Sequence, residues 1–173
     1  MQVYLTHGIK DYDNKIGHDS PLTEEVNEIL IKKVVERVLD SCLPPSVIYC
    51  SPYLRCYQTA VLVIKELEDR SHYTPYLFFD NELSEFLGNQ TGNIKVTKET
   101  IERSQELLYG TDETVEEFKK RVEKWKFDHK NDEGVWIIGH RFFASVLSNG
   151  NILNYCSILS YNGKDYIELL NDI

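Results

Sequence analysis

The chain has 173 residues, 42% of them hydrophobic and 27% charged, which is typical of one folded domain with a buried core. Its formal net charge of -9 at pH 7 argues against general nucleic-acid binding, because phosphate backbones attract clustered Lys and Arg. The sequence shows no basic leader followed by an apolar run, and none of its apolar runs is long enough to span a membrane. We therefore expect one cytoplasmic domain over residues 1–173 that does not associate with a membrane.

Short apolar runs and longer periodic segments alternate along most of the chain. Four apolar runs bounded by turn residues predict strands, namely Val3–Leu5, Val47–Cys50, Tyr76–Phe79 and Val135–Ile138. Three segments with apolar residues at helical spacing predict helices, namely residues 23–42, 54–70 and 112–130. Thr23 is the expected N-cap of the first helix, and the acidic residues after it favour a helix N-terminus.

The C-terminal part of the chain carries a hairpin signal. Asn162 and Gly163 stand between two β-rich runs within residues 157–170, and an Asn-Gly pair favours a tight turn. The polar residues 88–111 are expected to form an insertion with a helix around Glu99–Leu108. Strand and helix alternation predicts an α/β fold of three layers, α/β/α, with a mostly parallel central sheet and a C-terminal β-hairpin.

Chemically active side chains follow the ends of the four predicted strands. Ligands of open α/β sheets bind beyond the carboxyl ends of the strands. The candidates at these positions are Thr6 and His7, Arg55, Glu82 and Glu85, and His140 and Arg141. Two histidines, two arginines and a carboxylate are therefore expected to face one pocket.

This set of side chains suits phosphoryl transfer from an ester. A neutral imidazole can attack phosphorus, cationic groups can stabilise the equatorial oxygens, and a carboxylic acid can protonate the leaving alcohol. The four cysteines have no zinc-site or C-x-x-C spacing. We therefore expect free thiols, no metal and no cofactor.

Five segments and the closing hairpin carry a resemblance to a known family, in the order "VYLTHG", "DSPLTEE", "IYCSPYLRCYQTA", "NELSEFLG" and "VWIIGHRF". By these segments the chain resembles the histidine phosphatase superfamily, also called phosphoglycerate mutase-like. The resemblance implies a phosphoglycerate mutase-like fold and a metal-independent phosphomonoesterase. It implies that His7 is the nucleophile, Arg55 a phosphate ligand, Glu85 the proton donor and His140 the second histidine of the pocket. The implied substrate is a phosphorylated small molecule or a phosphoprotein, and the oligomeric state is left open.

The first motif departs from the family pattern, which is R-H-G. Thr6 stands at the position of the arginine, so a fixed positive charge with paired donors is missing. Thr6 can offer a hydroxyl to the substrate, and Arg141, where many members have glycine, is a candidate to supply the lost charge. His18, in the loop after the first motif, is a further candidate at the pocket rim.

Two alternatives compete with a histidine phosphatase. A catalytically weak or inactive member acting as a phospho-ligand or protein-binding module would explain Thr6, although such a module needs neither a nucleophile nor an acid. A cysteine phosphatase would use Cys50 and Arg55, but "CSPYLR" has four intervening residues where that family requires five. Pro52 also removes an amide from the phosphate loop, so this second alternative is disfavoured.

Overall fold

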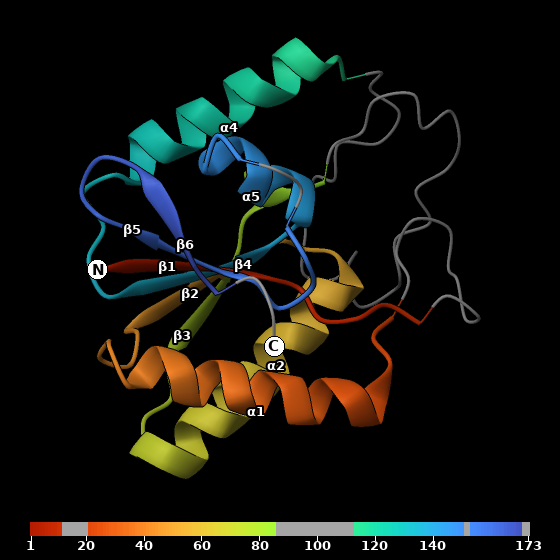
Figure 1. The fold of residues 1–173 in the computed structure, drawn as a ribbon, viewed down its shortest axis with the longest axis vertical. Helices are drawn as coiled ribbons and strands as arrows, with labels where there is room; N and C mark the ends of the chain where they lie inside the picture. Colours follow the sequence, from red (N-terminus) through yellow and green to blue (C-terminus); the bar gives the residue numbers. More distant parts are fainter. Residues whose placement is uncertain (12–20, 86–112, 151–152, 171–173) are drawn as a thin grey trace.

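The computed structural model describes residues 1–11, 21–85, 113–150 and 153–170. Strands and helices alternate along the chain until the final hairpin (Figure 1). In chain order the elements are β1 (Gln2–Thr6), α1 (Glu24–Leu39), β2 (Val47–Cys50), α2 (Leu54–Ser71), β3 (Tyr76–Phe79), the 3-10 turn η1 (Asn81–Leu83), α4 (Val115–His129), β4 (Val135–Gly139), α5 (Arg141–Leu147), β5 (Ile158–Tyr161) and β6 (Tyr166–Leu170).

These strands form one mixed sheet in the order β3-β2-β4-β1-β5-β6. The first four strands of that order run parallel, while β5 and β6 are antiparallel and form the hairpin. Helices α1 and α2 cover one face of the sheet, and α4 and α5 cover the other (Figure 1). The predicted three-layer α/β fold with a mostly parallel sheet and a C-terminal hairpin is confirmed.

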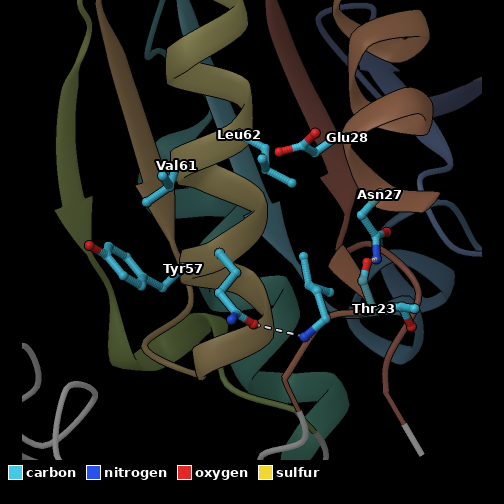
Figure 2. Close-up of a pocket in the computed structure, with 8 residues that line it drawn as sticks. Thr23, Asn27, Glu28, Tyr57, Val61 and Leu62 are labelled. Carbon is cyan, nitrogen blue, oxygen red and sulfur yellow. Dashed lines mark hydrogen bonds between the residues drawn. The ribbon is translucent and has the colours of Figure 1, made fainter. Parts of the chain in front are cut away.

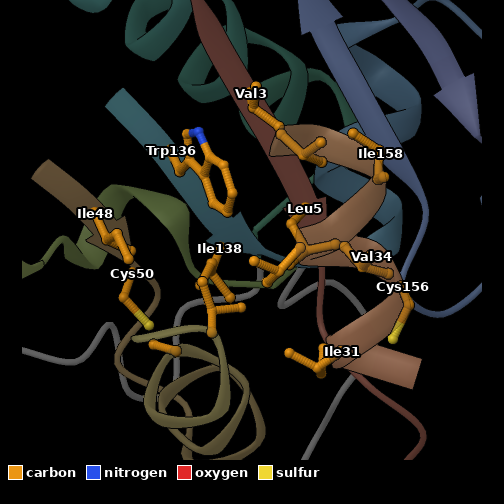
Figure 3. Close-up of a cluster of buried hydrophobic side chains, with 14 of the residues drawn as sticks. Val3, Leu5, Ile31, Val34, Ile48, Cys50, Trp136, Ile138, Cys156 and Ile158 are labelled. Atoms are coloured by element: carbon orange, nitrogen blue, oxygen red, sulfur yellow. The ribbon is translucent and has the colours of Figure 1, made fainter. Parts of the chain in front are cut away.

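The alternation of side chains along β1 divides the core into two clusters. Val3 and Leu5 pack toward α1 and α2 in the cluster drawn in Figure 3. Tyr4, which lies between them, packs toward α4 and α5 with Phe143. Because neighbouring strand residues point to opposite faces, β1 is fixed between two apolar layers. Its carboxyl end, which carries Thr6 and His7, is thereby held in place.

The helix ends differ in detail from the sequence expectation. Helix α1 ends at Leu39, earlier than predicted, and Thr23 occupies the N-cap position without a side-chain capping bond. Helix α4 begins after a capping box between Thr114 and Glu117. The short helix α5 was not predicted, and the expected helix at 99–108 lies outside the described residues.

Within the described ranges, no helix is both long and apolar enough to cross a membrane.

A buried tyrosine joins β1 to the end of β4. The Tyr4 hydroxyl accepts a hydrogen bond of 2.8 Å from the His140 amide and lies 3.2 Å from the His140 carbonyl, to which it donates. The residue before His140 is Gly139, and a Cβ there would lie 2.1 Å from the Tyr4 hydroxyl oxygen. Glycine is therefore required at position 139 for the close approach that holds the backbone of His140.

We predict that Gly139→Ala lowers the free energy of unfolding by roughly 1–3 kcal/mol, the usual cost of overpacking a core. Chemical denaturation of the purified variant measures this change. In a Tyr4→Phe background the oxygen nearest the added methyl is absent, so the same substitution should cost less there. Equal costs in the two backgrounds would show that the Tyr4 hydroxyl does not impose the glycine.

Candidate active site

His7 is the first residue after β1 and is only 2% exposed. Its amide donates to the Gly139 carbonyl at 2.9 Å, which fixes the backbone against β4. Its Nδ1 lies 2.8 Å from the Gly8 carbonyl oxygen. Because a carbonyl only accepts, Nδ1 carries the proton and Nε2 keeps its lone pair. The lone pair of a nucleophilic imidazole is therefore at Nε2.

The residue after His7 must be glycine because α1 approaches it closely. A Cβ on Gly8 would lie 2.2 Å from Oδ1 of Asn27 on α1. That Oδ1 accepts from the Ile9 amide at 2.7 Å, and the Asn27 Nδ2 donates to the Ile9 carbonyl at 2.9 Å. From the other side, the Thr59 hydroxyl of α2 accepts from the Gly8 amide at 3.0 Å. Both helices thus hold the turn that positions His7.

Arg55, in the first turn of α2, links the two histidines of the site. Its Nε donates to His7 Nε2 at 3.3 Å and its Nη2 donates to His140 Nδ1 at 3.0 Å. Since a guanidinium cannot accept, both ring nitrogens must be acceptors. His140 Nε2 consequently carries the proton and donates to the Ser51 hydroxyl at 2.7 Å. The guanidinium also lies 4.8 Å from the centroid of the Tyr53 ring.

His140 and Glu85 complete the group of side chains. His140 is the N-cap of α5 and is fully buried. A carboxylate oxygen of Glu85 lies 3.6 Å from His140 Nδ1, and the Glu85 side chain is 23% exposed. The structure therefore brings His7, Arg55, His140 and Glu85 to one place, with the carboxyl group at the more open side.

The electrostatic environment keeps both imidazoles neutral. Burial and then the positive charge of Arg55 hold the pKa of His7 well below its usual range, although the bond to the Gly8 carbonyl acts in the opposite direction. The pKa of His140 is also well below its usual range because of burial, Arg55 and His7, in that order. A neutral His7 is the form that a nucleophile requires.

Thr6 does not contact this group through its hydroxyl. The residue is fully buried, and its hydroxyl donates to the Asn154 carbonyl at 2.8 Å while accepting from the Ser157 amide at 2.8 Å. Both bonds hold the turn before β5. The substrate-binding role predicted for Thr6 is therefore not supported by its contacts.

Arg141 lies beside the group on the first turn of α5. Its Nε donates to the Leu153 carbonyl, and its guanidinium lies 4.5 Å from the centroid of the Tyr155 ring. The same ring is 5.5 Å from that of His7. Among the residues that the structure describes, the two Nη groups of Arg141 have no hydrogen-bond partner. His18, the other predicted rim residue, lies outside the described residues.

Sequence reasoning missed two residues near His7. Tyr155 forms an aromatic wall between His7 and Arg141. Lys10, whose backbone pairs with that of Leu22 in an isolated antiparallel β-bridge, carries a charge that contributes to lowering the pKa of His7. A tyrosine in an irregular stretch carries no sequence signal of this role. Lys10 lies three positions after His7, and this proximity was the available signal.

A separate pocket of about 480 Å³ lies between α1 and α2 (Figure 2). Asn27 and Tyr57 are among the residues that line it, whereas His7 and Arg55 are not. Its wall touches the turn after His7 through Asn27, whose side chain bonds the amide and the carbonyl of Ile9. This pocket is therefore a neighbour of the site and not the place where the histidines meet.

Comparison with known proteins identifies related sequences and folds. The profile described as "Histidine phosphatase superfamily (branch 1)" matches residues 5–150, whereas no curated protein sequence matches. The ecdysone phosphate phosphatase of Bombix mori has 18% identity and a TM-score of 0.65, covering 96% of this chain and 91% of that one. The phosphoserine phosphatase of Entamoeba histolytica has 13% identity and a TM-score of 0.64, covering 99% and 96%. A mycobacterial glucosyl-3-phosphoglycerate phosphatase has 17% identity and a TM-score of 0.58, covering 96% and 94%.

We predict that stability falls as the pH is lowered through about 6.5, the usual pKa of histidine. Below that pH the unfolded chain protonates His7 and His140, whereas the native protein keeps them neutral because its pKa values are lowered. The unfolded state then binds more protons, so the free energy of unfolding decreases by up to ~1.4 kcal/mol per pH unit for each ring. Urea unfolding at pH 7.5, 6.5 and 5.5 measures the slope.

The matched variants for this measurement are His7→Gln and His72→Asn, which replaces the exposed C-cap residue of α2. The first removes one buried titrating ring, so its stability should change less between pH 7.5 and 5.5 than that of the wild type. The second controls for the replacement of a histidine that lies outside the site. A His7→Gln slope equal to that of the wild type would contradict the assignment of a buried neutral ring to His7.

Proposed function

The chain belongs to the histidine phosphatase superfamily, and from this premise we propose that it hydrolyses phosphate monoesters through a phosphohistidine on His7. The observation that carries the proposal is the single guanidinium of Arg55, which lies 3.3 Å from His7 Nε2 and 3.0 Å from His140 Nδ1. A phosphoryl group placed at these atoms meets a nucleophilic lone pair and a fixed cation together. The Glu85 carboxyl is next to them, 3.6 Å from His140.

The first step forms a P–N bond and breaks the P–O ester bond. His7 Nε2 gives its lone pair to phosphorus, and the ester oxygen leaves with the electron pair of the broken bond. Glu85 in its acid form gives that oxygen a proton, so that an alcohol departs. For this attack the Arg55 N–H groups turn from His7 Nε2, to which they donate without substrate, to the equatorial oxygens, and the charge of Arg55 offsets the negative charge of the transferring group.

The second step restores the enzyme. Glu85, now a carboxylate, accepts a proton from water while the water oxygen attacks phosphorus. The P–N bond breaks, its electron pair returns to His7 Nε2, and inorganic phosphate leaves. Across the two steps the chain supplies the first nucleophile, the group that acts as acid and then as base, and fixed donors, while water is the second nucleophile. The mechanism therefore requires no metal and no cofactor.

The substrate class that we propose is a phosphorylated small molecule or phosphoprotein. The names of the structural neighbours, among them phosphatases of ecdysone phosphate and of phosphoserine, support a phosphate ester without selecting one. A binding module without turnover is the competing proposal, motivated by Thr6. The position of Glu85 beside His140 favours turnover, because a module that only binds phosphate gains nothing from an acidic side chain there.

We further propose that Arg141 supplies the cation that the first motif lacks. Its guanidinium is stacked on Tyr155, the ring that faces His7, and its charge contributes to the low pKa of His7. The Nη groups are available as paired donors for a phosphate oxygen. Thr6, whose hydroxyl is bonded to Asn154 and Ser157, then has a structural role.

We predict that the purified protein hydrolyses p-nitrophenyl phosphate in the presence of EDTA and that His7→Ala removes this activity. Rapid acid-free quenching with a labelled ester should trap a phosphoryl group that is stable in alkali and lost in acid, as expected of a phosphohistidine. His72→Asn is the control variant. Activity that disappears with EDTA and returns with magnesium or zinc would refute the proposed mechanism.

We predict opposite effects for substitutions at Arg141 and Thr6. Arg141→Gln removes a charge-assisted bond worth about 1.5–3 kcal/mol, so vanadate affinity should fall by about tenfold or more, whereas the lost bond to the Leu153 carbonyl should lower the free energy of unfolding by only about 0.5–1.5 kcal/mol. Thr6→Val leaves the Ser157 amide unpaired, so the free energy of unfolding should fall by about 1–3 kcal/mol, and vanadate affinity should fall less than in Arg141→Gln, because Thr6 acts on the anion only through the turn that places Tyr155. Titration with vanadate and urea unfolding measure the two quantities, and a reversed pattern would assign the anion contact to Thr6.

A further inference from the structure

Arg121 of α4 uses every N–H group of its guanidinium. Nη1 donates to the carbonyls of Glu82 and Ser84 at 2.6 and 2.9 Å, and Nη2 lies 3.4 Å from the carbonyl of Glu85. Nε and Nη2 also donate to the two carboxylate oxygens of Glu113 at 2.8 and 2.9 Å. A guanidinium has five N–H donors in a fixed plane. All five are therefore assigned to named acceptors.

The pair formed by Arg121 and Glu113 is well shielded from solvent. Their side chains are 11% and 9% exposed, so the pair is screened less than a surface ion pair. The capping box of Thr114 and Glu117 fixes the start of α4 directly after Glu113. The carboxylate therefore holds the guanidinium in the orientation that points its Nη groups at the 82–85 backbone.

The backbone that Arg121 holds carries the proposed acid. Glu85 follows η1 and lies outside any helix or strand, so regular hydrogen bonds of a helix or sheet do not fix it. Helix α4 holds the start of this stretch as well, because the Trp125 indole donates to Asp80 at 2.7 Å and Asp80 caps η1 through the Glu82 amide. Arg121 provides the corresponding contact at the end of the stretch. The same guanidinium thus joins position 85 to position 113, the two sides of residues 86–112.

We infer that Arg121 is a positioning residue for the proton transfer: by bonding the carbonyls of residues 82, 84 and 85, it sets the Glu85 carboxyl within 3.6 Å of His140. This inference rests on the proposed function. Arg121 contacts neither His7 nor Arg55 through a hydrogen bond, so the phosphate contacts do not depend on it directly. Its loss should harm protonation of the leaving group and spare phosphate binding.

The test compares two esters in wild type and Arg121→Lys, which keeps the charge but cannot bond three carbonyls and a carboxylate at once. For an alkyl phosphate, whose leaving group must be protonated, kcat/KM should fall on the order of 100-fold, the lower end of general-acid contributions. For 2,4-dinitrophenyl phosphate, whose leaving group departs as a stable anion, the fall should stay below about threefold. Because kcat/KM covers only the steps through transfer to His7, later hydrolysis does not affect the comparison.

Two further variants separate positioning from folding. Glu113→Gln keeps the shape of the partner and removes its charge, so it should show the same selectivity between esters with a smaller loss. Lys124→Gln, one turn further along α4, breaks an exposed ion pair with the Glu82 side chain and should leave both esters at wild-type rates. Vanadate affinity should be unchanged in all three variants, and thermal unfolding confirms that each is folded.

The outcomes distinguish this inference from the proposed function. A wild-type protein that hydrolyses neither ester, or a His7→Ala variant that keeps activity, would refute the proposed function. An active wild type whose Arg121→Lys and Glu113→Gln variants lose activity equally for both esters, or lose none, would refute the positioning role alone. Weakened vanadate binding in parallel with a uniform loss would show that Arg121 has a general structural role instead.

Discussion

The site depends on one buried cation that is shared by two neutral rings. Arg55 is 3% exposed and donates to His7 and His140, so its charge helps to keep both imidazoles unprotonated. Removing a cation from water is costly unless its donors are satisfied. Two ring nitrogens accept from the donors of Arg55, and a phosphate dianion would place opposite charge beside it. On the proposed function, the charge of the site is therefore complementary to that of the substrate.

The fold provides this arrangement because the ends of its parallel strands are aligned. Thr6 of β1 is opposite Gly139 of β4, and Cys50 of β2 is opposite Ile138. The residues that follow these strands must therefore emerge at one edge of the sheet. Close contacts at the two glycines, one against Tyr4 and one against Asn27, then fix the backbone of each histidine. Sheet register places both histidines at one edge, and the hydrogen bonds of their ring nitrogens to the Gly8 carbonyl, Ser51 and Arg55 set the direction of the rings.

The sequence predicts which residues come together at the site, but not how each of their side chains is oriented. The four parallel strands and the convergence of His7, Arg55, Glu85 and His140 follow from local patterns, because strand ends can be read from short apolar runs. The orientation of Thr6 could not be predicted, since its partners lie about 150 positions away in a turn without a pattern. Arg121 was missed for the same reason: among the lysines of α4 its sequence context is that of a solvent-exposed helix residue, and its acceptors are backbone atoms.

The use of Thr6 to hold the turn before β5 changes how the site is built. In the R-H-G pattern the strand that carries the nucleophile also carries a cation, whereas here the side chain at that position is bonded to Asn154 and Ser157. The same turn places Tyr155 between His7 and Arg141. A threonine that orders the turn therefore also orders the ring on which Arg141 stacks. If Arg141 is the substitute cation, as we propose, Thr6 supports it indirectly through the turn that places Tyr155, while its own hydroxyl stays bonded to Asn154 and Ser157.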